Sequence, residues 1–297
     1  MRATRTVRTD LQVCPQALRR ITPKAKQKTS LATKEAPTDD HSNRESPLVF
    51  RPSRQNRCAR WFRLGALRRR RWPQASSQWD SLRHILHPRD GFYNGVKARE
   101  VTPGGGKLGI ENIARRGIAG RGVLLDVARL LESAGRPIDY TTAAVITKDV
   151  LSDCAEQQGV TIETGDILII RTGWLAWYLN EATAEQKQEM SGEAMVHLRA
   201  PGIGPDEEMA AYLWDLHIAA VAGDNPSLEA WPPGPESGGF LHFRLIPLLG
   251  MNIGELWYLE DLAADCAQDG VYEFMLTSAP LNVPGGVGSP PNALAIK

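Results

Sequence analysis

Two short apolar runs in the middle of the chain limit the folds that the sequence can adopt. Residues 122–127 read Gly-Val-Leu-Leu-Asp-Val, and residues 165–171 read Gly-Asp-Ile-Leu-Ile-Ile-Arg. Their length and their β-branched content favour strands that are buried on both faces. Residues 147–158 lie between them and carry an apolar helix face that ends at Gly159, a typical helix stop. This face comprises Val150, Leu151 and Cys154.

The alternation of helix and strand continues toward the C-terminus. Residues 206–216 follow Pro205 and begin with three acidic residues, which favour the start of a helix. The apolar stripe of this helix comprises Met209, Leu213 and Leu216. A strand over 218–222, a helix over 260–268 and a strand over 272–278 complete the pattern. We therefore predict an α/β or α+β fold, with a mixed sheet and flanking helices in one domain without internal repeats.

The charges divide the chain into two unlike segments. Residues 1–73 hold 19 Lys and Arg against 5 Asp and Glu, whereas residues 74–297 hold 16 against 29. The basic segment has little hydrophobic periodicity, so we predict that it is disordered and that residues 74–297 form the folded domain. Its arginines could direct the chain to mitochondria, and the run 68–71 could contact nucleic acid. No aromatic stacking pattern accompanies these charges, so we do not expect a nucleic-acid partner.

Absent motifs disfavour several classes of protein. The four cysteines show no C-x-x-C spacing, so neither a zinc ribbon nor a disulfide framework is indicated, and a reducing compartment fits best. No apolar run approaches the roughly 18 residues that span a bilayer, so we expect a soluble, cytoplasmic protein without a membrane partner. The serine-hydrolase motif G-x-S-x-G does not occur, and residues 104–107 lack the context of a phosphate-binding loop.

Residues 74–84 read Gln-Ala-Ser-Ser-Gln-Trp-Asp-Ser-Leu-Arg-His and contain the first pair that suggests chemistry. Asp80 and His84 are four residues apart, so a helical turn would place both side chains on one face, within reach of one small ligand. A carboxylate and an imidazole can share a metal-bound water. The alternative is structural: Asp80 caps a short helix over 81–87 that stops at Pro88. The residues alone leave both interpretations open.

The run Ser-Ser-Gln-Trp-Asp-Ser-Leu-Arg-His that ends at His84, with Phe-Tyr-Asn-Gly at 92–95, resembles the fungal branch of the cyclase family, which includes the bacterial kynurenine formamidases. In that family the signature His-x-x-x-His-x-Asp-x-x-x-His supplies three metal ligands and, at its last position, a catalytic base. The resemblance implies that Asp80 binds the metal and that His84 is the base. Gln74 and Gln78 stand where the two ligand histidines would be, and Gln78 is kept as a candidate ligand.

The resemblance also assigns residues further along the chain. His242 lies in Phe-Leu-His-Phe, a setting that is also typical of a core histidine, and Glu255 lies in Gly-Glu-Leu. Family members carry a His ligand and then a Glu ligand at about this separation, which implies that His242 and Glu255 complete the metal site. The motif Gly-Asp-Asn-Pro-Ser around Asp224 matches as well, and we expect Asp224 and Trp79 to contact the substrate. The similarity extends over residues 76–297.

For the domain 74–297 the resemblance implies the β/β/α fold of the kynurenine formamidases. Family members have strands and a substrate-wall segment ahead of the signature, and residues 1–73 resemble neither. We therefore interpret residues 1–73 as a divergent segment that does not belong to the folded enzyme.

The activity that the resemblance implies is metal-assisted hydrolysis of a formamide, an ester or a lactone. N-formylkynurenine, an intermediate of tryptophan catabolism, is the default substrate by analogy, which makes the chain an arylformamidase. Because Gln74 and Gln78 offer amides in place of imidazoles, we expect one hard ion such as Mn²⁺, with Zn²⁺ as the alternative. The competing interpretations are a family member that has lost catalysis and acts as a binding or scaffold protein, or a cyclase of secondary metabolism. Relatives are commonly homo-oligomers, and we expect the same here.

Overall fold

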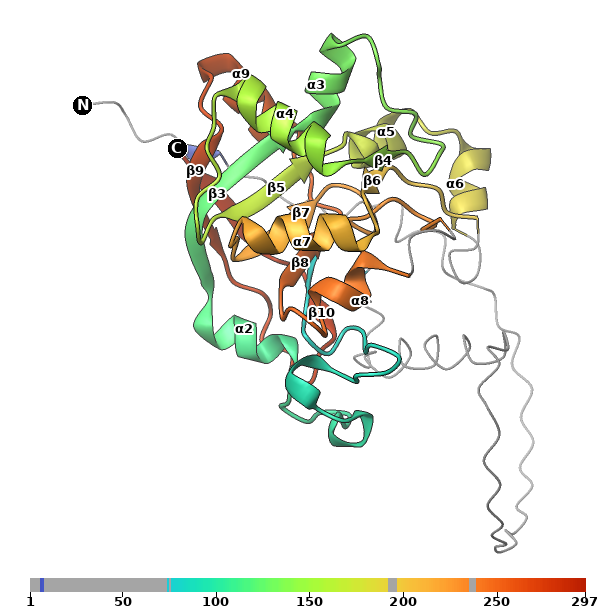
Figure 1. Cartoon of the computed structure of the whole chain (residues 1–297), viewed down its shortest axis with the longest axis vertical. Helices are drawn as coiled ribbons and strands as arrows, with labels where there is room; N and C mark the ends of the chain where they lie inside the picture. The colour runs from blue at the N-terminus through green and yellow to red at the C-terminus, as the bar shows by residue number, and fades with distance from the viewer. Residues whose placement is uncertain (1–5, 8–73, 75, 192–196, 235–238) are drawn as a thin grey trace, which may run out of the picture. The chain divides into compact units, whose positions relative to one another are not determined.

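A nine-stranded mixed sheet forms the centre of the part of the chain that the structure describes (Figure 1). The structure is a computed structural model, and it describes residues 6–7, 74, 76–191, 197–234 and 239–297. The strand order is β1-β11-β9-β3-β5-β7-β8-β2-β10, and a separate two-stranded sheet pairs β4 with β6. The strands are β1 (Thr6–Val7), β2 (Gln78–Asp80), β3 (Ile118–Asp126), β4 (Val145–Ile146), β5 (Ile167–Arg171), β6 (Gly202–Ile203), β7 (Ala220–Gly223), β8 (Asn252–Glu255), β9 (Glu273–Ser278), β10 (Gly288–Ser289) and β11 (Ala293–Ile296).

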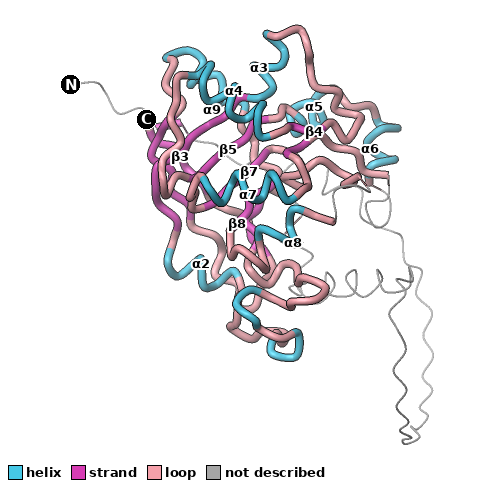
Figure 2. The backbone as a smooth tube through the Cα atoms, viewed as in Figure 1, coloured by secondary structure: helices cyan, strands magenta, loops and turns pink. Residues whose placement is uncertain are grey.

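The four strands β3, β5, β7 and β8 run parallel and lie side by side in Figure 2. In register, Leu124 of β3 pairs with Ile169 of β5, which pairs with Ala222 of β7. All three side chains are buried. The flanking strands join this block antiparallel, β9 beside β3 and β2 beside β8. A parallel block buried on both faces is what the two apolar runs predicted, so the mixed α/β fold is confirmed.

Successive residues of the inner strands point into two different cores. In β5, Leu168 and Ile170 belong to one apolar cluster, whereas Ile167 and Ile169 belong to another on the opposite face. This alternation follows from the two-residue period of a strand. The sheet therefore needs helices on both sides to exclude water.

Helices cover both faces of the sheet. α4 and α7 lie in front of it in Figure 1 and contribute to the first core with α8, whereas α9 contributes to the second. The helices are α2 (Ile110–Arg116), α3 (Val127–Ser133), α4 (Lys148–Gln158), α5 (Trp174–Asn180), α6 (Ala184–Met190), α7 (Glu207–Asp215), α8 (Leu241–Leu245) and α9 (Glu260–Asp269), with short 3-10 helices η2 (Tyr93–Gly95) and η3 (Ala98–Glu100). Helix α4 begins where the Thr147 side chain accepts the N–H of Val150, and it ends at Gly159 with φ 66°. The three helices predicted from the sequence, α4, α7 and α9, are confirmed.

The predicted helix over residues 81–87 is wrong. Asp80 ends the strand β2, and the chain then turns, with the N–H of His84 donating to the carbonyl of Ser81 at 2.9 Å. The Ser81 N–H donates to the carbonyl of Val287, and the buried Arg83 guanidinium donates to the carbonyl of Gly105. These contacts with distant segments hold the residues after Asp80 in a turn and satisfy their polar groups without a helix.

Most of residues 1–73 lie outside the described residues, so the predicted disorder of that segment and its Arg run 68–71 stay predictions. Thr6 and Val7 are the exception, because they pair antiparallel with Ile296 and Ala295 of β11. None of the described helices is long and apolar enough to cross a membrane.

Candidate metal centre

Buried polar side chains gather at the carboxyl end of the parallel block, where α/β sheets commonly bind ligands. β8 ends at Glu255, and the register of β2 places Gln78 directly opposite it. Since side chains alternate along a strand, Gln78 and Asp80 face the side of Glu255, whereas Trp79 faces the other. Helix α8 packs into the core on the side of Glu255 and supplies His242.

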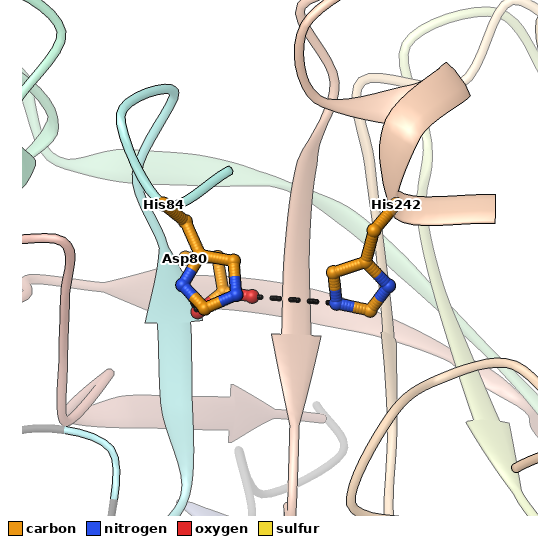
Figure 3. A group of neighbouring side chains, drawn as sticks. All are labelled: Asp80, His84 and His242. Atoms are coloured by element: carbon orange, nitrogen blue, oxygen red, sulfur yellow. Dashed lines mark ion pairs between the residues drawn. The ribbon is translucent and has the colours of Figure 1, made fainter. Parts of the chain in front are cut away.

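Figure 3 shows Asp80, His84 and His242 directed toward one another from β2, the turn after it and α8. Asp80 Oδ1 lies 3.6 Å from His84 Nδ1, and Asp80 Oδ2 lies 3.8 Å from His242 Nε2. His242 Nε2 is also 3.1 Å from Glu255 Oε1. One ligand atom of each residue in the trio Asp80, His84 and His242 lies within 4.8 Å of the other two. We call these four residues, Asp80, His84, His242 and Glu255, the cluster.

The charges of the cluster are strongly coupled. Burial, and next the carboxylate of Glu255, raise the pKa of Asp80 well above its usual range. Burial lowers the pKa of His242, but the carboxylates of Glu229 and Glu255 outweigh it and hold that pKa well above its ordinary value. Burial and the charge of His242 lower the pKa of His84 to about 3. Without a metal, His242 is therefore the cation of the cluster at neutral pH, and His84 is neutral.

Two glutamine amides surround Asp80. Gln74 Nε2 donates to Asp80 Oδ1 at 3.0 Å and lies 2.7 Å from His84 Nδ1. Gln78 Nε2 donates to Glu255 Oε2 at 2.6 Å and to Asp80 Oδ1 at 3.4 Å. Gln74 and Gln78, which the resemblance aligns with two ligand histidines, are therefore within the site and donate to its carboxylates through their N–H groups.

The donor atoms of the cluster fit a divalent cation. Asp80 Oδ2 and Gln78 Oε1 are buried, and neither has a hydrogen-bond partner among the described residues. Buried polar atoms without a partner are rare and call for an explanation. Asp80 Oδ2 lies close to the imidazole nitrogen of His242, which in turn contacts Glu255 Oε1. Carboxylate oxygens with one imidazole nitrogen are ligands that suit Mn²⁺ or Zn²⁺.

The structure does not bring Trp79 and Asp224, the predicted substrate contacts, into the cluster. Trp79 has no exposed surface and packs edge-on against Trp257 in the core on the opposite face of the sheet. Asp224 accepts hydrogen bonds from the backbone N–H and hydroxyl of Thr172 and from the N–H of Gly173. The alternation of side chains along β2 directs Trp79 away from the cluster, and the loop after β5 donates hydrogen bonds to Asp224. Both side chains therefore have structural partners.

Sequence reasoning missed Glu229, which is fully buried and contacts His242. Its Oε2 lies 2.7 Å from His242 Nδ1. The sequence offers one signal for it, a lone carboxylate in the stretch Ser-Leu-Glu-Ala-Trp, since a charge buried among apolar residues needs a partner.

Comparison with known proteins identifies the family. Residues 34–230 match the family model described as "Putative cyclase", and the predicted domain boundary at residue 73 lies inside this range. A crystal structure described as a novel cyclase is 37% identical, with a TM-score of 0.65, over 76% of this chain and 70% of that chain. No curated protein matches the chain.

Two further solved structures share the fold. Isatin hydrolase A from Labrenzia aggregata is 17% identical, with a TM-score of 0.50, over 74% of this chain and 72% of that chain. Isatin hydrolase A from Ralstonia solanacearum is 18% identical, with a TM-score of 0.50, over 74% and 71%. The fungal branch that the sequence suggested stays a prediction. The model match and the solved cyclase together show that the chain belongs to the cyclase family.

Proposed function

We propose that the chain is a metal-dependent hydrolase that cleaves a small amide, ester or lactone. The observation that carries the proposal is the convergence of Asp80 Oδ2, His242 Nε2 and Glu255 Oε1 in one buried cluster. A divalent ion held there would polarise a scissile carbonyl and lower the pKa of water. Membership of the cyclase family and the fold shared with two isatin hydrolases agree with hydrolysis.

His84 moves the proton in this proposal. Its ring is neutral at pH 7, and the nearby Gln74 Nε2 donates to Nδ1, so Nδ1 carries the lone pair and Nε2 carries the hydrogen. Nδ1 also lies 3.6 Å from Oδ1 of Asp80, the carboxylate whose other oxygen is the proposed ligand atom. In the proposed hydrolysis the proton of the attacking water displaces the Gln74 N–H at His84 Nδ1, and His84 then gives that proton to the leaving amine or alcohol.

Aromatic side chains beside the cluster favour a substrate with an aromatic ring. Phe243 follows His242 in α8, stacks on Phe240 at 4.9 Å between ring centroids, and meets the ring of His87 edge-on at 6.2 Å. All three of these rings are partly exposed. An N-formylkynurenine-like arylformamide has a ring that such a surface can bind, so we retain it as the first substrate to test.

One observation supports a second candidate function, a binding protein without catalysis. The amides of Gln74 and Gln78 already donate to Asp80 Oδ1 and Glu255 Oε2, so part of the negative charge of the cluster is stabilised without an ion. A protein of this kind would retain its fold and bind small molecules, but it would need no metal.

Metal analysis combined with a hydrolysis screen separates the two functions. The full chain, stripped by a chelator and then loaded with Mn²⁺ or Zn²⁺, is assayed on an arylformamide, an aryl ester and a lactone. We expect about one ion per chain and turnover that depends on it. A chain that binds neither ion and hydrolyses none of the three substrates would contradict the hydrolase proposal.

Two substitutions test the roles within the cluster. Asp80→Ala should abolish both metal retention and turnover. His84→Ala should keep the metal and lower turnover by roughly 10²- to 10⁴-fold, the usual effect of removing an acid-base group. The matched controls are Asp149→Ala, whose side chain is 79% exposed on α4, and His197→Ala, also exposed. Loss of metal in His84→Ala would instead make His84 a ligand.

A further inference from the structure

Glu229 contacts His242 on the side of the ring that faces away from the rest of the cluster. Its carboxylate is fully buried, and the two hydrogen bonds that it forms with described residues both involve His242, with Oε2 2.7 Å from ring Nδ1 and Oε1 3.4 Å from the backbone nitrogen. We propose that Glu229 is a positioning residue that fixes the tautomer and orientation of His242 for metal binding. This inference rests on the proposed function, because it concerns the same metal site.

The geometry assigns opposite tasks to the two ring nitrogens of His242. A carboxylate can only accept, so Nδ1 carries a hydrogen and donates it to Glu229. The ring nitrogen that is left for an ion is then Nε2, which lies 3.1 Å from Glu255 Oε1 and 3.8 Å from Asp80 Oδ2. Without the acceptor, the ring could take the other tautomer or rotate, and either change would direct a hydrogen toward the ion. A carboxylate behind a ligand imidazole is a recurrent way to orient it.

The loop that carries Glu229 is held rigidly. The carbonyl oxygen of Glu229 accepts the Ser227 hydroxyl at 2.8 Å, and its neighbours Leu228 and Ala230 exchange backbone hydrogen bonds with Ile203 of β6. A Cβ atom at Gly202 would lie 2.3 Å from the carbonyl carbon of Glu229, so only glycine permits this close approach. The backbone therefore fixes Glu229 before any ion binds.

A purely structural role for Glu229 makes a different prediction. If the ion pair with His242 served only the core, removing the carboxylate would change the melting temperature and leave the affinity for an ion unchanged once the chain is folded. A positioning role requires the affinity itself to change, and it requires recovery when a neutral acceptor replaces the carboxylate.

The test measures the dissociation constants of Zn²⁺ and Mn²⁺ with the stripped full chain, using a competing chelator of known affinity. Glu229→Leu keeps a similar volume and removes the acceptor, and we expect it to weaken binding by about 10- to 100-fold, as for other residues that orient ligands. Glu229→Gln keeps an acceptor and should recover part of the loss. The matched control is Glu111→Gln, since Glu111 is also fully buried but bonds to the N–H of Gly285.

A second measurement needs no variant. In nitrogen-correlated NMR spectra of the zinc-loaded wild type, His242 should be the tautomer with its hydrogen on Nδ1. The proposal is overturned if the hydrogen is found on Nε2, if Glu229→Leu binds both ions as tightly as the wild type, or if Glu111→Gln weakens binding equally. A wild type that binds neither ion overturns the proposed function and this inference together, and that failure is recognised because it appears before any substitution is made.

Discussion

Replacing Asp80 by asparagine should change the stability of the metal-free and the metal-loaded protein in opposite directions. In the metal-free protein, burial and Glu255 raise the pKa of Asp80 above 3.8, its value in an unfolded chain. The folded state therefore keeps a proton that the unfolded state loses, and stability falls as the pH rises from about 4 through the folded pKa. An asparagine side chain cannot ionise, so metal-free Asp80→Asn should melt at or above the wild-type temperature, with a difference that grows between pH 4 and pH 8.

The metal-loaded protein should show the reverse. An ion at 100 times its dissociation constant stabilises a folded protein by about 2.7 kcal/mol. For a domain of this size that corresponds to a rise in melting temperature of about 5–11 °C. Removing one partner of a buried ionic contact costs about 3–5 kcal/mol, which weakens binding by between about two and four powers of ten. At the same concentration the ion should then stabilise Asp80→Asn by at most about 0.4 kcal/mol, which raises its melting temperature by roughly 1–2 °C.

Thermal melts followed by circular dichroism at pH 5, 6, 7 and 8, with chelator or with Mn²⁺, measure both effects. Asp149→Asn is the control, because its exposed carboxylate on α4 should alter neither curve. The reasoning is refuted if Asp80→Asn shows the same ion-induced rise as the wild type. It is also refuted if the metal-free variant loses stability relative to the wild type as the pH increases.

Three further predictions concern the core and the surroundings of the site. Leu151→Ala, at a fully buried position of α4, should lower the free energy of unfolding by about 2–5 kcal/mol in chemical denaturation, whereas Met275→Ala, 54% exposed on β9, should change it by less than about 0.5 kcal/mol. Gln78→His should tighten zinc in a chelator competition, because it adds an imidazole beside Asp80, and unchanged affinity would exclude position 78 from the ligands. Burial raises the pKa of Asp224 to about 6, so wild-type stability should fall between pH 4 and pH 6 through this group, and Asp224→Asn should flatten that slope in denaturant titrations.

The elements that the sequence predicted carry their signals locally. Helix α4 has a threonine cap, an apolar face and a glycine stop within one short segment, and β5 has four consecutive apolar residues. Strand β2 has no such signal, because three residues cannot show a period and because its partner Glu255 lies 177 positions from Gln78. By local rules alone, Asp80 qualifies as a helix cap and the residues after it qualify as a helix. Long-range pairing instead makes β2 a strand, and the chain turns after Asp80.

The candidate site was predictable only in part for a similar reason. The resemblance to a family supplied His242 and Glu255, since neither residue is distinctive in its own segment. Glu229 was missed because its role depends on a loop held by Gly202 and Ile203, which no local pattern reveals. The resemblance also suggested substrate contacts from Trp79 and Asp224. The alternation along β2 directs Trp79 to the opposite face of the sheet, and the loop after β5 donates hydrogen bonds to Asp224, while both substrate contacts stay predictions.

The two glutamines determine how many ions the cluster is expected to hold. Asp80 Oδ1 accepts from both Gln74 and Gln78, and Glu255 Oε2 accepts from Gln78, so one oxygen of each carboxylate is engaged by an amide. The other oxygens, Asp80 Oδ2 and Glu255 Oε1, both face His242 Nε2. Imidazoles at positions 74 and 78 would have left both oxygens of Asp80 open to cations. Because amide N–H groups already engage one oxygen of each carboxylate, the carboxylate and imidazole atoms left for a cation are Asp80 Oδ2, Glu255 Oε1 and His242 Nε2, beside the amide oxygen Gln78 Oε1. We therefore expect one ion per chain, and the oxygen-rich set favours Mn²⁺ over Zn²⁺ more than a site with three histidines would.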